Sequence, residues 1–247
     1  MRSPSEDRAP PTPLLEAEDV SFRWAAGLAP SVELQRFTIA RDERVFLYGP
    51  SGSGKSTLLG LFGGVLAPQR GRVRILGTEI TSMSAARRDA FRVDHIGFIF
   101  QQFNLIPYLS VVENALLPCR FSRRRRERAV EARGTLEAEA LRLLEELDLA
   151  PSLYARNVTQ LSVGQQQRVA AARALIGRPE LIIADEPTSS LDAERQQGFL
   201  DLLLRECEST RAALLFVSHD RRLAAHFTRK VAMDEVSRAA PTQGEAA

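Results

Sequence analysis

A glycine-rich segment at residues 49–57 places the strongest constraint on the fold of this chain. It reads Gly-Pro-Ser-Gly-Ser-Gly-Lys-Ser-Thr and fits the pattern G-x-x-x-x-G-K-[ST]. An apolar run at residues 45–48 precedes it, and a helical stretch at residues 58–62 follows it. Glycines let consecutive backbone N–H groups point at one anion, and the dipole of the following helix favours negative charge there. The segment therefore predicts a strand–loop–helix unit that binds a chain of phosphates.

Every residue of this segment is expected to line the phosphate site. The set is Gly49, Pro50, Ser51, Gly52, Ser53, Gly54, Lys55, Ser56 and Thr57. Lys55 would reach the outer phosphates of ATP, and the Ser56 hydroxyl would bind magnesium. The alternative is a tight glycine turn that caps a helix. The strand, the lysine and the hydroxyl are all in place, and lysine is rare in this chain, so we favour the phosphate site.

Apolar runs of strand length occur at residues 45–48, 96–100, 181–184 and 212–217. They lack polar alternation, as strands buried on both faces do. Helical patterns lie between several of them, which favours an α/β fold with a largely parallel sheet. Val20, Phe22 and Trp24 instead alternate with polar residues, and this pattern predicts a half-buried strand in an antiparallel element.

Polar side chains follow these apolar runs, and in such sheets ligands bind beyond the carboxyl ends of the strands. The residues are Gln101, Asp185, Glu186, Ser218 and His219. We expect four strand ends to converge on one site. Asp185 would hold magnesium, and Glu186 would orient or deprotonate the attacking water. An Asp-Glu pair that merely caps the next helix is the alternative, and the nearby phosphate loop argues against it.

A second phosphate site is predicted at residues 161–168, which read Leu-Ser-Val-Gly-Gln-Gln-Gln-Arg and lead into a helical run at residues 169–176. Ser162 and Gly164 would lie at a helix N-terminus, where anions bind favourably. Two copies of the chain could then grip one γ-phosphate from both sides across a two-fold axis. An ordinary serine cap is the alternative.

Composition excludes several other classes of protein. The 33 basic residues nearly cancel the 31 acidic residues, so no global field marks a nucleic-acid binder. No apolar run approaches the roughly 20 residues that span a bilayer. Residues 1–13 lack the apolar region of a secretion signal and are expected to form a disordered tail. Residues 237–247 are expected to form a loose tail, and Cys119 and Cys207 to be reduced thiols.

Residues 101–160 differ in character from the rest of the chain and suggest an inserted helical subdomain. One helical face would carry the apolar residues Leu136, Ala140, Leu143, Leu144 and Leu147. An arginine run occupies residues 123–126. A solvated helix face is the default interpretation of this run, and contact with acidic lipid headgroups is the alternative.

Taken in order, these motifs over residues 14–236 resemble the ATP-binding subunit of ABC transporters. The resemblance implies a P-loop NTPase (RecA-like) core with an antiparallel β-subdomain and an inserted α-helical subdomain at about residues 98–165. It further implies a head-to-tail homodimer that hydrolyses two ATP molecules. Each ATP would lie between one copy's phosphate loop and the LSGGQ-type segment of the other. Ser162, Gly164 and Gln165 would contact the partner's nucleotide.

The resemblance also implies roles for single residues. Gln101 resembles the glutamine that senses magnesium and couples to a membrane partner. Asp192 resembles the aspartate that links the two sites, and His219 resembles the switch histidine at the γ-phosphate. Trp24 occupies the position of an aromatic residue that stacks on adenine, although a second core aromatic beside Phe22 is nearly as good an interpretation.

The sequence departs from the family pattern at two positions. Val163 replaces the first glycine of LSGGQ, and because a β-branched residue resists positive φ, we expect ordinary backbone angles there. Ser190 replaces the more usual alanine before Leu191 and Asp192, which is a small change.

Residues 97–107, 111–114 and 186–192 resemble most the ATPases of lipoprotein-releasing and macrolide-exporting systems. This predicts a separate integral membrane permease as partner, a periplasmic or extracellular adaptor as a further one, and a place on the cytoplasmic face of the plasma membrane. Two alternatives stay open. One is a non-transport ABC ATPase of the cell-division type, and the other is a small-molecule P-loop kinase, which leaves residues 161–168 unexplained.

Overall fold

The computed structural model describes residues 12–189 and 191–239, and their strands form two sheets. The antiparallel sheet contains β1 (Leu15–Phe22), β2 (Val32–Ile39), β4 (Arg70–Ile75) and β5 (Thr78–Glu79). The parallel sheet contains β3 (Arg44–Tyr48), β6 (Ile96–Ile99), β7 (Leu181–Asp185), β8 (Ala213–Val217) and β9 (Arg229–Ala232). The α/β class predicted from the sequence is confirmed, and the four predicted apolar strands are β3, β6, β7 and β8.

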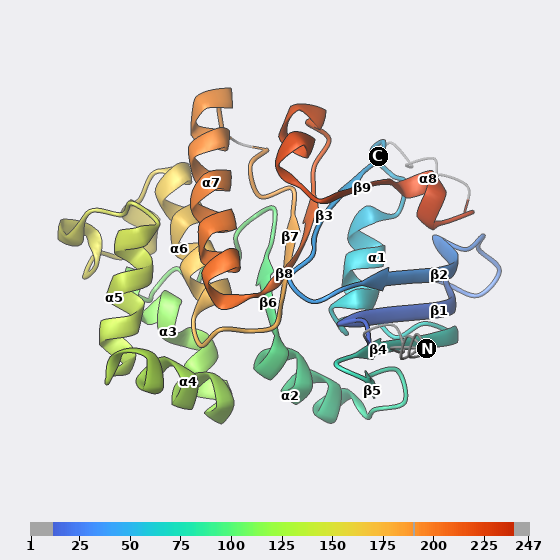
Figure 1. Cartoon of the computed structure of the whole chain (residues 1–247), viewed down its shortest axis with the longest axis horizontal. Coiled ribbons are helices and arrows are strands. Elements are labelled where there is room, and N and C mark those ends of the chain that lie inside the picture. Colours follow the sequence, from blue (N-terminus) through green and yellow to red (C-terminus); the bar gives the residue numbers. More distant parts are fainter. Residues whose placement is uncertain (1–11, 190, 240–247) are drawn as a thin grey trace, which may run out of the picture.

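The parallel strands lie in the order β6-β7-β8-β3-β9, and the antiparallel strands in the order β2-β1-β4-β5. The α-helices are α1 (Lys55–Phe62), α2 (Ala85–His95), α3 (Val111–Phe121), α4 (Arg123–Arg133), α5 (Leu136–Glu146), α6 (Val163–Leu175), α7 (Ala193–Thr210) and α8 (Met233–Val236). The parallel sheet lies in the centre of the molecule, with α3 to α7 on one side and α1 and the antiparallel sheet on the other (Figure 1).

Alternate residues of the parallel strands serve two separate hydrophobic cores. Leu214 and Phe216 of β8 pack in a core with α6 and α7. Ala213, Leu215 and Val217 of the same strand pack in a core with α1 and the antiparallel sheet. Because both faces are covered, every residue of β8 is buried, which explains the continuous apolar run in the sequence.

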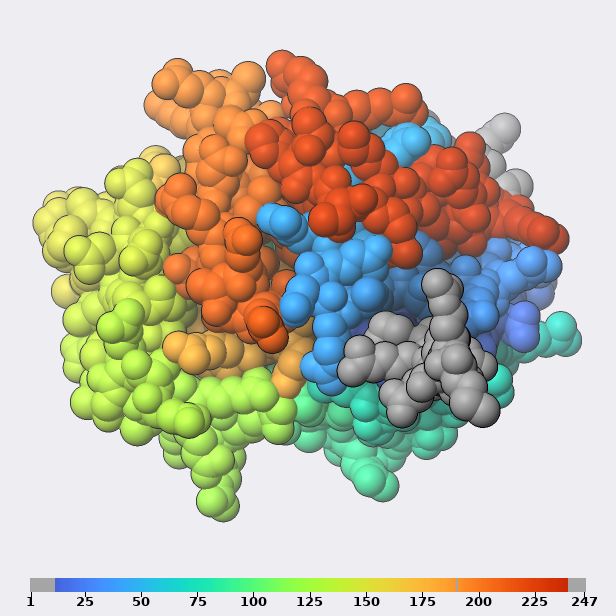
Figure 2. Space-filling model, viewed as in Figure 1, coloured from blue at the N-terminus to red at the C-terminus, as the bar shows by residue number. Residues whose placement is uncertain are grey.

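Helices α3 to α5 lie between β6 and α6 in the chain, within the range where the sequence suggests a helical subdomain. The apolar face expected there is buried, since Ala140, Leu143, Leu144 and Leu147 belong to the core on the helical side. These helices form the outer layer at the left of the space-filling view (Figure 2). No helix among the described residues is both long and apolar enough to cross a bilayer.

The arginine run at the start of α4 is not a uniformly solvated face. Arg125 is 1% exposed, and it donates hydrogen bonds to the carbonyls of Ile96, Ala174 and Ile176. The prediction of a solvated face is therefore wrong for Arg125. Its guanidinium satisfies backbone acceptors where α4 meets the end of α6 and the start of β6, a role that depends on tertiary contacts.

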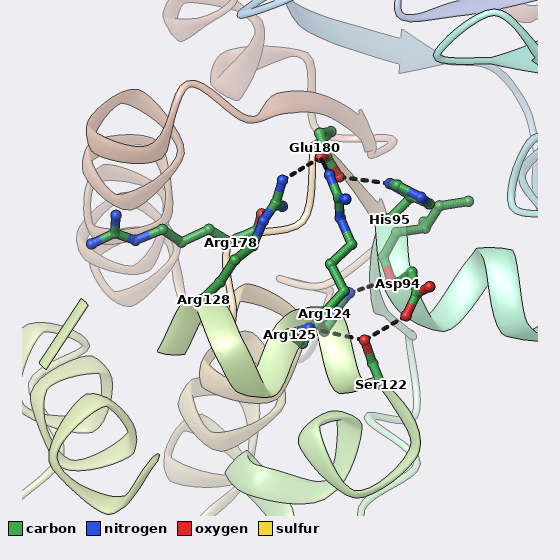
Figure 3. A network of polar contacts seen from close by, with 9 residues as sticks. Asp94, His95, Ser122, Arg124, Arg125, Arg128, Arg178 and Glu180 are labelled. Atoms are coloured by element: carbon green, nitrogen blue, oxygen red, sulfur yellow. Dashed lines mark hydrogen bonds and ion pairs between the residues drawn. The ribbon is translucent and has the colours of Figure 1, made fainter. Parts of the chain in front are cut away.

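Glu180, just before β7, connects α4 to the parallel sheet through polar side-chain contacts (Figure 3). It accepts hydrogen bonds from Arg124 and Arg128, each at 2.7 Å, and its other oxygen lies 3.0 Å from Nδ1 of His95. Burial raises the pKa of Glu180, but the hydrogen bonds from His95, Arg128 and Arg124 outweigh burial and hold the pKa below its ordinary value.

The C-terminal part of the described chain is bound to the antiparallel sheet. The hydroxyl of Ser237 accepts a hydrogen bond from the amide of Glu33 at 2.9 Å, and the amide of Arg238 donates to the Glu33 carbonyl at 2.8 Å. These two residues, which the sequence places in a loose tail, therefore extend the folded unit. Residues 1–11 and 240–247, which hold most of both predicted tails, lie outside the described residues.

Candidate functional site

The loop at residues 49–57 joins β3 to α1 as the sequence predicts. Gly52 and Gly54 have positive φ angles of 76° and 89°, which glycine adopts without steric cost. A Cβ atom on Gly54 would also lie 2.5 Å from the carbonyl oxygen of Ser31. Glycine at position 54 is thus required by its backbone angle and by close packing.

Lys55 lies at the mouth of this loop. It is 7% exposed, and its Nζ donates hydrogen bonds to the carbonyls of Gly49 at 2.9 Å and Pro50 at 2.8 Å. The ammonium group is therefore held within the loop by backbone dipoles. A phosphate oxygen would offer it a stronger, charge-assisted hydrogen bond in the same place.

Ser56 and Asp185 meet between α1 and the end of β7. Burial raises the pKa of Asp185 above its ordinary value, and the Glu186 carboxylate raises it further, whereas a hydrogen bond from Ser56 and the charge of Lys55 lower it. A hydroxyl and a carboxylate that converge beside a phosphate loop fit the oxygen ligands of magnesium. The net effect is a carboxylate whose negative charge lacks full compensation from the protein.

Glu186 and His219 form a pair at the ends of neighbouring strands. β7 and β8 run parallel with Asp185 opposite Val217, so the residues after both strands lie side by side. Oε2 of Glu186 lies 3.2 Å from Nδ1 of His219. Glu186 has a φ of 42° in the left-handed region, and its amide donates to the carbonyl of Val217 at 3.0 Å. Such strain in a non-glycine residue is typical of functional sites.

Ser162 and Gln165 cap the N-terminus of α6 reciprocally. The Gln165 side chain accepts from the Ser162 amide at 2.9 Å, and the Ser162 hydroxyl accepts from the Gln165 amide at 3.4 Å. Val163 is the first residue of α6 and is not among the described residues with positive φ, as we expect. The exposed end of α6 also borders a hollow of 600 Å³ that reaches Leu191. Ser162 thus caps α6, whereas the loop at residues 49–57 leads into α1.

Comparison with known proteins identifies the family of this chain. A protein-family profile described as ABC transporter matches residues 33–189. The chain belongs to the ABC transporter family. The ATP-binding protein LolD 2 of a lipoprotein-releasing system in Rhodospirillum rubrum is 39% identical over 221 residues, which are 89% of this chain and 93% of that protein.

Two further comparisons show the same cassette in other settings. The probable syringafactin export ATP-binding/permease protein SyfD of Pseudomonas syringae is 37% identical over 222 residues; these are 89% of this chain and only 33% of that longer protein. A solved dimeric structure of the ATP-binding cassette MJ0796, in a post-hydrolysis state with ADP and Pi, matches with a TM-score of 0.77 and 33% identity. The match covers 93% of this chain and 99% of that chain. The predicted P-loop NTPase fold and the ATPase activity of this ABC protein are thereby confirmed.

Three other predicted residues of the ABC protein lie on its surface. Gln101 is exposed beyond the end of β6, and its side chain has no hydrogen-bond partner among the described residues. Asp192 caps α7 by accepting from the amide of Arg195 at 3.0 Å, and Ser190 lies outside the described residues. Trp24 is 62% exposed and packs edge-on against Phe22 at 5.1 Å. Trp24 is therefore not a core residue, and adenine stacking stays a prediction.

Sequence reasoning missed two groups that shape the site. Met233 of α8 is buried behind the phosphate loop, since a Cβ on Gly49 would lie 2.8 Å from the Cβ of Met233. Arg173 of α6 donates hydrogen bonds to the carbonyls of Phe103 and Asn104, beyond Gln101. An arginine within the apolar run at residues 169–176 is a signal that could have indicated a buried polar contact.

Replacement of Asp185 by asparagine is expected to increase the stability of the chain and to weaken its magnesium-dependent binding of ATP. The raised pKa means that the ionised carboxylate opposes folding, so D185N should raise the free energy of unfolding at pH 7 in the absence of nucleotide. The difference should vanish below about pH 3, where the carboxyl is mostly protonated in both states. Urea unfolding at both pH values measures this. Magnesium-dependent ATP binding should weaken, and a D185N protein less stable than the parent at pH 7 would contradict the analysis.

Proposed function

We propose that this ABC ATPase works as a head-to-tail homodimer that powers a separate membrane permease. The observation that carries the dimer is the separation of two phosphate-binding features within one chain. The loop at residues 49–57 lies between β3 and α1, whereas Ser162 caps α6, a different helix. A second copy related by a two-fold axis supplies the missing half of each site. The dimeric MJ0796 cassette supports this arrangement.

In the proposed site, catalysis rests on positioning and electrostatics. The loop amides and Lys55 bind the phosphates of ATP. Ser56 and Asp185 hold magnesium, and Gln101 approaches the same ion from β6. Magnesium supplies positive charge that neutralises the phosphate oxygens. Each of these residues extends from a strand end or loop at the same edge of the parallel sheet.

Glu186 and His219 act at the γ-phosphate in this proposal. The Glu186 carboxylate orients water and accepts its proton, and its contact with His219 fixes the direction of its oxygens. His219 in turn binds the γ-phosphate. From the second copy, Ser162, Gly164 and Gln165 contact the same phosphate, while Asp192 joins the two sites. Trp24 stacks on the adenine ring from its exposed position.

The permease is proposed to dock on an apolar groove between α3 and the sheet core. The groove has a volume of 280 Å³, and its apolar lining includes Val65, Phe98, Phe100, Leu117, Pro118 and Phe121. Phe121 is 73% exposed and Val65 is 50% exposed, which is unusual for large apolar side chains gathered at one place. The groove also borders the segment that follows Gln101, so an occupant could influence the nucleotide site.

The names of the relatives support the kind of transport. LolD 2 belongs to a lipoprotein-releasing system, and SyfD is a probable syringafactin exporter with its ATP-binding and permease parts in one chain. We propose that this chain drives export or extraction of a lipoprotein, peptide or other amphipathic substrate, with a periplasmic or extracellular adaptor as further partner. It would then lie on the cytoplasmic face of the plasma membrane, attached through the permease.

Glu186→Gln is expected to retain ATP binding and to nearly abolish hydrolysis, because the amide cannot accept the proton from water. ATP should then trap a dimer that gel filtration resolves from the monomer. Phosphate release and elution volume are the two measurements. Near-normal phosphate release would refute the role of Glu186, and a monomer under saturating ATP would refute the dimer.

Purification of the tagged chain from membranes of its own organism, in mild detergent, tests the proposed partner. A polytopic membrane protein should co-purify in stoichiometric amount, and Phe121→Glu should lose it because a charge in the groove disfavours apolar docking. Glu127→Gln, at an exposed position on α4, serves as the control and should retain the partner. Retention of the permease by F121E would exclude this groove, and a partner of the cell-division type would exclude transport.

A further inference from the structure

Helix α6 connects two functional segments that lie far apart in the sequence. Its N-terminus is capped by Ser162, and Arg173 lies in its last turn. The guanidinium of Arg173 donates one hydrogen bond to the carbonyl of Asn104 at 2.6 Å and another to the carbonyl of Phe103. The C-terminal end of α6 is thus hydrogen-bonded to the backbone two and three residues after Gln101.

The backbone at these two residues is strained. Phe103 and Asn104 have φ angles of 58° and 49°, in the left-handed region. A bulky side chain such as that of Phe103 adopts this conformation only at a steric cost, which is smaller for asparagine, and the conformation persists where the surroundings hold it. Local bonds alone are few, namely Phe103 amide to Phe100 carbonyl and Asn104 amide to Gln102 carbonyl. Arg173 binds the carbonyls of both strained residues at once.

Arg173 is suited to this task by its burial. It is 9% exposed, and burial lowers its pKa to about 10, so it stays charged at neutral pH. Among the described residues it forms no ion pair with a carboxylate, and the two carbonyls are its acceptors. A buried charge is costly without acceptors, so the guanidinium and the turn at Phe103 and Asn104 require each other.

Arg125 of α4 is hydrogen-bonded to the same end of α6. Its Nη1 donates to the carbonyls of Ala174 and Ile176, both at 3.2 Å, and its Nη2 donates to the carbonyl of Ile96 at 2.5 Å. Ile96 opens β6, the strand that leads to Gln101. The C-terminal end of α6 is therefore hydrogen-bonded to both ends of β6. Arg125 binds the start of this strand, and Arg173 binds the segment that follows it.

We propose that Arg173 is a positioning residue that fixes the segment at residues 101–105 to α6, so that this segment and the Ser162 end of the helix move as one body. A displacement of Ser162 then also displaces Gln101 and the lining of the adjoining apolar groove. The fixing of the segment is a property of the single chain. Its use in communication rests on the proposed function, in which a second copy's nucleotide contacts Ser162.

Hydrogen exchange of the nucleotide-free and metal-free chain tests the fixing directly. Arg173→Met should speed exchange of the Phe103 and Asn104 amides about ten-fold or more, because the bonds that hold their turn are lost. Arg173→Lys keeps the charge but lacks the planar fork that reaches both carbonyls, and it should give an intermediate rate. Arg142→Met is the matched control, since Arg142 of α5 binds Glu139 of the same helix and Glu206 of α7. It should leave these two amides unchanged.

A second readout tests communication. In the Glu186→Gln background, ATP should slow exchange in residues 101–105, and R173M should remove that response while R142M retains it. Unchanged exchange in nucleotide-free R173M, or an equal change in R142M, would overturn the inference. If R173M fails to fold, the intermediate rate expected of R173K decides. If ATP forms no dimer in the Glu186→Gln protein, the proposed function fails, and the nucleotide-free exchange rates still decide the role of Arg173.

Discussion

Parallel pairing of β3, β7 and β8 is the constraint on which the rest of the structure depends. The register places Leu47 opposite Val217 and Asp185 opposite Val217 on the other side of β8. All three strands therefore end at one edge, and the phosphate loop, the Asp185–Glu186 pair and His219 follow from these ends. Backbone hydrogen bonds and the two cores fix this register. The register, and not the loop sequences alone, therefore determines where the site residues lie.

The site gathers charges that the protein compensates incompletely. Asp185 keeps a raised pKa although Ser56 and Lys55 lie close to it, and Lys55 donates to backbone carbonyls of its own loop. Glu186 holds a strained backbone angle beside His219. The raised pKa of Asp185 and the left-handed backbone angle of Glu186 each cost stability in the isolated chain, and in the proposed function magnesium bound with ATP would offset the charge of Asp185. This is the behaviour expected of a site that is complementary to its substrate and not optimised for its own fold.

The strands and the phosphate loop could be predicted because their signals are local. Continuous apolar runs give β3, β6, β7 and β8, and glycine positions give the loop. Arg125 could not be placed, because its burial depends on carbonyls of Ala174 and Ile176 some fifty positions away. Met233 and the short β9–α8 unit carry no pattern that separates them from a tail. The role of Ser162 is predicted from its place at a helix N-terminus, whereas the roles of Gln101 and Asp192 come from resemblance. All three side chains are exposed, and their proposed partners are ATP and a second copy.

The central claim is that one chain holds half of each of two sites, and complementation between two inactive variants tests it most directly. Lys55→Ala removes the phosphate grip of one copy, and Ser162→Arg blocks the α6 contact of the other. A mixture should regain hydrolysis, because the heterodimer contains one site with Lys55 and Ser162 both intact. The account predicts activity up to about a quarter of the parent's, since half of the dimers at equal mixing carry one intact site. A mixture as inactive as its two components would contradict it.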